Sequence, residues 1–167
     1  GTLDIDGSLT ISGDITISGS ATFDIAASKT LTYSGDEIDV GANTLSIDGT
    51  GTITNSNNIN LNATASLIEL VGATISKINQ SADAASSKGI TVATTASTIT
   101  TFTSGGQSRI DLGANLTITD DFNLTGETMI LSGTSTLDGG AITLNNVNSL
   151  IQVTAACTID NNLTLSA

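Results

Sequence analysis

The segment TLDIDGSLTIS, residues 2–12, contains two short runs of alternating apolar and polar residues, separated by Asp-Gly-Ser. Such alternation among Ile, Leu, Val and Thr is typical of β-strands, because successive side chains point to opposite faces. Gly and Asp supply the left-handed conformations and Asx turns of tight corners. The segment therefore predicts two strands joined by a corner.

The same pattern recurs along the whole chain of 167 residues. Residues 3–12, LDIDGSLTIS, align without a gap with LTITDDFNLT at 116–125 and with CTIDNNLTLS at 157–166. In this frame the spacing between units is about 21 residues, which is typical of stacked repeat architectures. The frame places the starts of the units near Thr2, Thr22, Thr44, Ser66, Ser97, Asn115, Thr136 and Cys157. Each unit has three strand-like runs, so we predict an all-β, three-faced parallel β-solenoid of about seven coils, forming a single domain over residues 1–167.

The frame also predicts which side chains stack inside the solenoid. The first face would stack Leu3, Phe23, Leu45, Leu67, Leu116 and Leu137, followed by Ile5, Ile25, Ile47 and Ile118. The second face would stack Ile11, Tyr33, Ile53, Phe102, Leu124, Leu144 and Leu165. The third face would stack Ile15, Ile38, Ile59, Ile90, Ile110 and Ile151. Cys157 would lie above Leu137 as a small buried hydrophobic residue.

One polar, alanine-rich stretch interrupts the spacing. Residues 79–89, NQSADAASSKG, predict an inserted corner loop about nine residues longer than a normal corner. Two interpretations stay open: a ligand-contact loop using Ser81, Asp83 and Lys88, or a corner insertion of the kind that solenoids tolerate.

Composition excludes several classes of function. Sixteen acidic residues against four basic ones give a net charge of -12, so nucleic acid and anionic membrane surfaces are not expected partners. The absence of histidine removes the usual general base and the Ser-His and Cys-His nucleophile pairs. Arg109 is the only arginine and no acids and bases are grouped, so we expect no enzyme and no cofactor. A structural calcium ion on stacked carboxylates such as Asp4 and Asp24 stays open, although the GGxGxD signature is missing.

Threonine and serine recur at outward positions of the second predicted face. The pairs are Thr10 and Ser12, Thr32 and Ser34, Thr52 and Thr54, Thr101 and Thr103, Asn123 and Thr125, Thr143 and Asn145, and Thr164 and Ser166. This pattern resembles the Thr-x-Thr array of ice-binding solenoids, and it is also what exposed strands favour, because threonine pairs well across strands.

The strings LTIS, ITIS, LSID and LTIT, joined by Gly-Ser, Gly-Asp and Asp-Gly, resemble the repeats of large bacterial surface proteins and phage fibres. Autotransporter passengers, filamentous-haemagglutinin-type adhesins and solenoid tail fibres are the families concerned. The resemblance implies a non-catalytic rod that is extracellular, at the cell surface or on a virion fibre.

Open strand edges at the ends of such a rod would bind copies of the chain or further solenoid coils. The residues predicted to make these contacts are Thr2, Leu3, Ile5, Leu163 and Leu165. The first alternative is an adhesin segment whose 79–89 loop binds a cell-surface receptor or glycan. The second is an ice-binding protein that uses the threonine-rich face.

Overall fold

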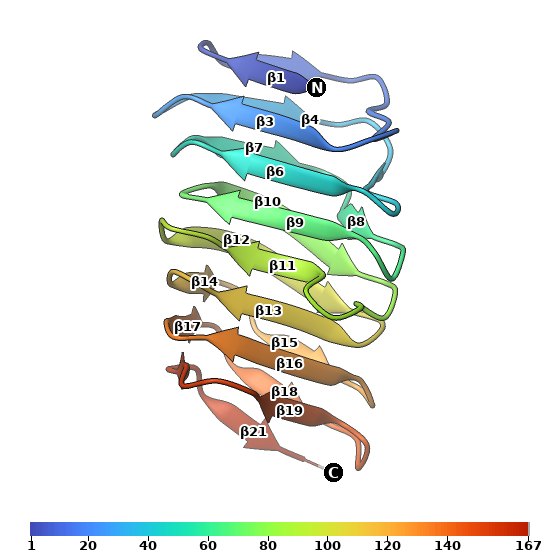
Figure 1. The fold of residues 1–167 in the computed structure, drawn as a ribbon, viewed down its shortest axis with the longest axis vertical. Helices are drawn as coiled ribbons and strands as arrows, with labels where there is room; N and C mark the ends of the chain where they lie inside the picture. Colours follow the sequence, from blue (N-terminus) through green and yellow to red (C-terminus); the bar gives the residue numbers. More distant parts are fainter. Residues whose placement is uncertain (167) are drawn as a thin grey trace.

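A computed structural model describes residues 1–166, which contain 21 β-strands and no α-helix. The strands wind as stacked coils about one long axis, with the two ends of the chain at opposite ends of the stack (Figure 1). Every recorded strand pair is parallel, and register partners such as Thr2 and Thr22 lie one coil apart. The predicted all-β parallel solenoid is therefore confirmed.

The coils contribute strands to three faces, except that the first coil has no strand on the third face. The first face is an eight-stranded sheet of β1 (Thr2–Ile5), β3 (Ala21–Ile25), β6 (Thr44–Asp48), β9 (Leu67–Val71), β11 (Gly89–Val92), β13 (Ser108–Leu112), β16 (Thr128–Gly133) and β19 (Leu150–Val153). The second face follows β2 (Leu9–Ile11), β4 (Thr30–Tyr33), β7 (Thr52–Asn55), β10 (Thr74–Gln80), β12 (Ser97–Ser104), β14 (Leu116–Ile118), β17 (Thr136–Gly139) and β20 (Thr158–Ile159). The third face contains β5 (Ile38–Asp39), β8 (Ile59–Leu61), the far ends of β10 and β12, and a separate sheet of β15 (Phe122–Leu124), β18 (Ile142–Leu144) and β21 (Leu163–Leu165).

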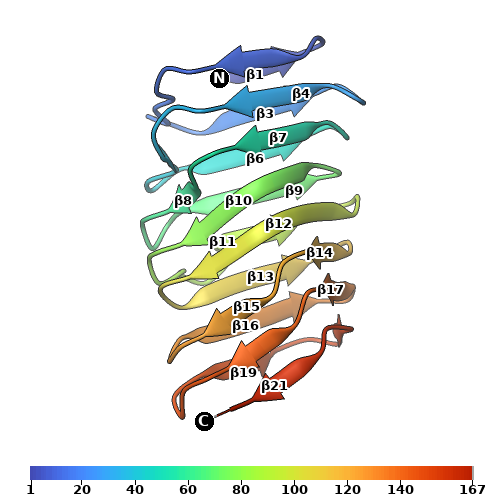
Figure 2. The same ribbon diagram turned by 180° about the vertical axis from the view of Figure 1, so that it is seen from behind.

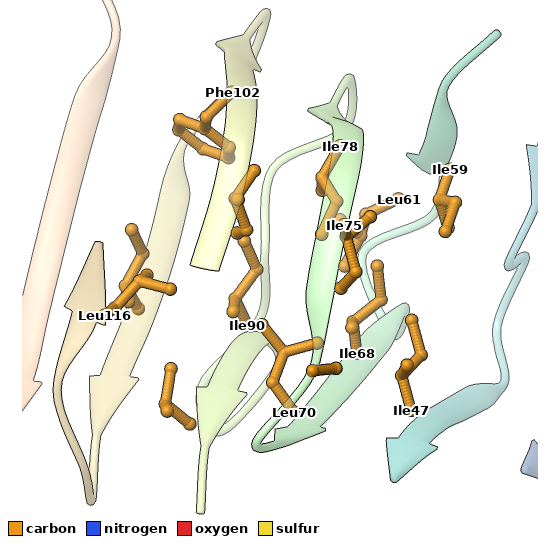
Figure 3. Packing of buried hydrophobic residues seen from close by; sticks show 14 of the residues in the cluster. Ile47, Ile59, Leu61, Ile68, Leu70, Ile75, Ile78, Ile90, Phe102 and Leu116 are labelled. Carbon is orange, nitrogen blue, oxygen red and sulfur yellow. The ribbon is translucent and has the colours of Figure 1, made fainter. Parts of the chain in front are cut away.

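The core consists of like residues stacked on like (Figure 3). On the second face, Leu31, Ile53, Ile75, Ile99 and Ile118 follow one another in register, and all five are fully buried. Period-two alternation directs these side chains inward, and burying each methylene contributes about 0.8 kcal/mol. The stacked aliphatic columns are thus the main source of stability.

Strand β10 crosses from the second face to the third without a break. Its residues Thr74 and Ile75 pair with β7, whereas Ile78 to Gln80 pair with β8. Between the two, the buried side chain of Asn55 accepts a hydrogen bond from Lys77 N at 3.2 Å and donates one to Lys77 O at 2.9 Å. The amide of Asn55 thereby replaces the missing backbone partner of Lys77 at the corner.

The structure corrects the alignment of the later coils. Leu116 pairs with Ser97 and Leu137 on the second face, not with first-face strands, so the match of 3–12 with 116–125 is wrong by one face. Phe102, Leu124, Leu144 and Leu165, predicted on the second face, lie on the third, and Ile90, Ile110 and Ile151, predicted on the third, lie on the first. All three faces carry the same alternation, and a gap-free match therefore fits equally well one face further along.

Smaller differences concern single positions. The predicted pairs Leu3 with Phe23 and Ile11 with Tyr33 are confirmed, but Phe23 then pairs with Ile47 rather than Leu45. Leu67 pairs with Thr44 and Gly89 and is only partly buried. Leu137 pairs with Ile159, and Cys157 is partly buried, packed against the core.

The predicted inserted loop has different bounds in the structure. Residues 79 and 80 belong to β10, and residue 89 begins β11, so the connection comprises residues 81–88. Gly89 lies in register with Leu67, one coil earlier, as the first-face residues of other coils do. The connection is longer than the other corners between the third and first faces, but β10 runs from the second face to the third without a corner of its own, which compensates for it.

Candidate functional surfaces

The first coil leaves an open edge and an apolar hollow at the N-terminal end of the rod. Strand β1 pairs only with β3, so its other edge has unpaired backbone N–H and C=O groups. A hollow of about 440 Å³ beside it is lined by Thr2, Leu3, Ile15 and Ile17, among others. Of the predicted contact residues, Thr2 and Leu3 line this hollow, whereas Ile5 does not line it and is buried, only 2% exposed.

The last coil exposes apolar side chains at the opposite end. Leu163 and Leu165 of β21 are 52% and 78% exposed, and Val153 of β19 is 48% exposed. These residues belong to the strands that would be covered by a further coil, because β19, β20 and β21 each pair on one side only. Large exposed apolar residues grouped on one end of a molecule indicate an interaction surface.

The second face, whose strands β10 and β12 lie at the front in Figure 2, has two columns of outward threonines. One column runs in register through Thr30, Thr52, Thr74, Thr98 and Thr117. Alternation places the residues two positions later in a second column, which comprises Thr10, Thr32, Thr54, Ser76, Thr100 and Thr119. In this column Thr10 pairs with Thr32, and Thr32 pairs with Thr54. We refer to these two columns as the threonine array.

The threonine array differs from the one predicted from the sequence. Thr10, Thr32, Thr52 and Thr54 lie on this face as expected. The predicted members Thr103, Asn123, Thr143 and Thr164 instead belong to third-face strands. Once the frame is corrected, every coil from β4 to β14 carries Thr-x-Thr or Thr-x-Ser, so the observed array is more regular than the predicted one.

Hydrogen bonds attach the connection 81–88 to the coils on either side. The hydroxyl of Ser81 donates to Asn60 Oδ1 at 2.7 Å, and Asp83 Oδ1 accepts from Gln107 N at 2.6 Å. Ala85 N donates to Thr64 O at 2.8 Å. Two of the three predicted contact residues, Ser81 and Asp83, therefore hold the connection in place.

The third predicted contact residue, Lys88, lies beside Arg109 on the outer side of the first face, where both line a small pocket. The sequence alone indicates only that Arg109 is the single arginine and that acids and bases are not grouped. The signal that could have found the pair is register: Ile90 pairs with Ile110, so Gly89 and Arg109 are neighbours across β11 and β13.

Carboxylates stack on the outside of the first face. Asp4 pairs with Asp24 as predicted, and Asp24 pairs with Asp48, which extends the column by one coil. Among residues 1–166, no group of three or more acidic or cysteine side chains is placed to hold a metal ion. Within the same residues, no helix has the length and apolar character needed to cross a membrane.

Comparison of the chain with models of known protein families, with curated protein sequences and with solved structures gives no match.

Proposed function

We propose that the chain is a non-catalytic structural rod of an extracellular fibre or filament, which stacks end to end through its open strand edges or continues into further coils. The observation that carries this proposal is the pair of end coils, with a hollow lined by Leu3, Ile15 and Ile17 at one end and the exposed Leu163 and Leu165 at the other. Burial of such residues on association is favourable by about 25 cal/mol per Å² of apolar surface.

The two ends are complementary when one copy follows another in the same direction. Each face ends in a strand at the C-terminal end, β19, β20 and β21, and the first two faces begin with β1 and β2 at the N-terminal end. In a head-to-tail stack, β19 would pair in parallel with β1 of the next copy, and β20 with its β2. Leu163 and Leu165 would then cover Ile15 and Ile17. Such a heterologous contact leaves a free edge after every addition and so generates an open filament.

Electron microscopy and sedimentation of the purified chain test the proposal. The native chain should form rods that lengthen with concentration and show an axial repeat of about 4.8 Å, the spacing between parallel strands. Leu165→Asp should disperse them, because a carboxylate cannot be buried in the junction without a partner. Thr32→Asp is the matched control, since Thr32 lies on the side of the rod and should leave assembly intact. Dispersed native monomers at every concentration would contradict end-to-end stacking.

A second candidate function is supported by the threonine array. Hydroxyl and methyl groups on one strand recur about 6.7 Å apart, and those of successive coils about 4.8 Å apart, so five coils present a two-dimensional lattice. A lattice of this kind suits an ordered surface such as ice. We therefore propose ice binding as the alternative to the structural rod.

Freezing-point depression separates this candidate from the first. If the array binds ice, the chain should lower the freezing point below the melting point. Thr74→Tyr together with Thr98→Tyr should abolish the difference, because two bulky rings interrupt the middle of the array. Asn123→Tyr, an exposed site on the third face, is the control and should keep it. Equal freezing and melting points for the native chain would exclude ice binding.

A further inference from the structure

A small pocket lies outside the first face, between the connection 81–88 and the strands that follow it. Its volume is about 270 Å³, and its lining includes Ser87, Lys88, Arg109, Asp111, Ile130 and Ser132. Figure 1 shows the connection leaving the body of the coil beside β11 and β13. The volume is below the range of about 300–1,000 Å³ that is typical of pockets for drug-sized ligands, so it suits a single small ring.

The pocket gathers half of the positive charge of the chain. Lys88 and Arg109 are two of only four basic residues, against 16 acidic ones. Arg109 Nε donates to Ala84 O at 3.1 Å, which fixes the guanidinium against the connection. Within residues 1–166, its two terminal nitrogens have no recorded hydrogen bond. A guanidinium held in this way presents a fork that matches the geometry of a carboxylate.

Backbone geometry brings the two cations together. Gly89 has φ +94°, and a Cβ at this position would lie 2.5 Å from Arg109 O. Only glycine allows β11 to begin so close to β13, since an L side chain would be strained in this conformation and would clash with backbone. Lys88, the preceding residue, is thereby held beside the Arg109 side of the first face.

An apolar floor accompanies the charges. Ile130 is in register with Arg109, and its neighbours Met129 and Leu131 both point into the core. Ile130 therefore points outward, yet it is only 6% exposed. The small part of Ile130 that is exposed lines the pocket, where it would meet the face of a ring while the charged groups surround the edge of the ring.

One acidic group completes the pocket. Asp111 is exposed, and Ser132 Oγ donates to its Oδ1 at 3.1 Å. A carboxylate is an acceptor only, so Asp111 suits a ligand that carries hydroxyl donors in addition to its negative charge. The net charge of -12 would repel a densely charged polyanion, whereas a single anionic group meets the two local cations.

We propose that this pocket binds a singly charged acidic sugar. The carboxylate of the sugar would contact Arg109 and Lys88, its ring would lie over Ile130, and a hydroxyl would donate to Asp111. A rod with this site would bind, along its side, a glycan that carries an isolated acidic sugar, and the proposal does not depend on whether the ends stack.

Titration of the chain by NMR with D-galacturonate tests the site, with D-galactose and inorganic phosphate as comparison probes. Galacturonate should shift the amide resonances of residues 86–91 and 109–111 in a saturable manner. Galactose should bind at least about tenfold more weakly, because it lacks the charge-assisted hydrogen bonds. Phosphate should also bind more weakly, because it makes no contact with Ile130.

Three single-charge variants complete the test. Arg109→Gln and Lys88→Gln should each weaken galacturonate binding about tenfold or more. Lys29→Gln removes the same charge outside the pocket and should have no effect, and dispersed spectra establish that each variant is folded. Three results would overturn the proposal: no saturable shifts with galacturonate, affinities unchanged by Arg109→Gln, or phosphate binding as tightly as galacturonate. Electron microscopy of the same samples scores filament formation separately.

Discussion

Replacement of Ile99 by alanine tests the stacked core directly. Ile99 lies on β12, in register with Ile75 in the preceding coil and Ile118 in the following coil, and all three are fully buried. Its neighbour Thr98 points outward on the same strand, in register with Thr74 and Thr117. The two positions differ in the direction of the side chain, not in the strand that carries them.

The expected loss of stability follows from the groups removed. Ile99→Ala deletes three carbon atoms, which corresponds to about 2.4 kcal/mol of transfer free energy at about 0.8 kcal/mol each. A cavity term adds to this loss, because backbone hydrogen bonds to the strands on both sides prevent the neighbouring coils from closing the gap. We expect the free energy of unfolding to fall by about 4 kcal/mol. Thr98→Ala should lower it by about 0.5 kcal/mol, the size of a cross-strand pair.

Urea unfolding followed by circular dichroism measures both variants, and native-state hydrogen exchange locates the effect. Because each coil of a solenoid contacts only its neighbours, the protection of backbone amides against exchange in Ile99→Ala should fall in β10, β12 and β14 before it falls in β1. Equal losses from Ile99→Ala and Thr98→Ala, or a loss below about 1 kcal/mol for Ile99→Ala, would refute the assignment of inward and outward positions.

Three further substitutions are measured by the same unfolding assay. Gly139→Ala should destabilise the chain by more than about 2 kcal/mol, because Gly139 has φ +118° and an added Cβ would clash with the backbone oxygen of Ile118. Gly7→Ala is the control: an added Cβ at Gly7 meets open space, so this substitution should leave stability nearly unchanged. Tyr33→Phe should cost about 1 kcal/mol, since the phenol oxygen accepts a hydrogen bond from Ile15 N at 3.1 Å; no loss would mean that water replaces the phenol. Asp24→Asn should raise stability by about 0.5 kcal/mol at low salt, because Asp24 stacks between Asp4 and Asp48, which carry the same charge. Added salt should reduce this gain, and a gain independent of salt would argue against charge repulsion.

Local features of the fold were predictable from the sequence. The period-two pattern identifies strands and their inward residues, as the pairs Leu3 with Phe23 and Ile38 with Ile59 confirm. Gly and Asp, which favour tight turns, mark the corners between the strands. The assignment of strands to faces failed after the predicted loop, from Ile90 onward, because no side chain distinguishes one face from another and the supposed insertion displaced the frame.

The candidate surfaces depend on that register, which explains why they were only partly foreseen. Thr74 and Thr98 join the threonine array only when β10 and β12 are placed on the second face. Lys88 and Arg109 are distant in sequence and adjacent in space because one coil separates β11 from β13. The exposed ends were predictable in kind, since a strand that pairs on one side only leaves its other edge open, and Leu163 and Leu165 are indeed exposed.

Contacts between isoleucine methyl groups, measured by NMR on methyl-labelled protein, test the central claim most directly. A parallel solenoid in the observed register predicts contacts from Ile75 to both Ile53, one coil earlier, and Ile99, one coil later. Close pairing of α-protons between β10 and the strand immediately before or after it, as antiparallel hairpins give, would contradict the stacked-coil fold.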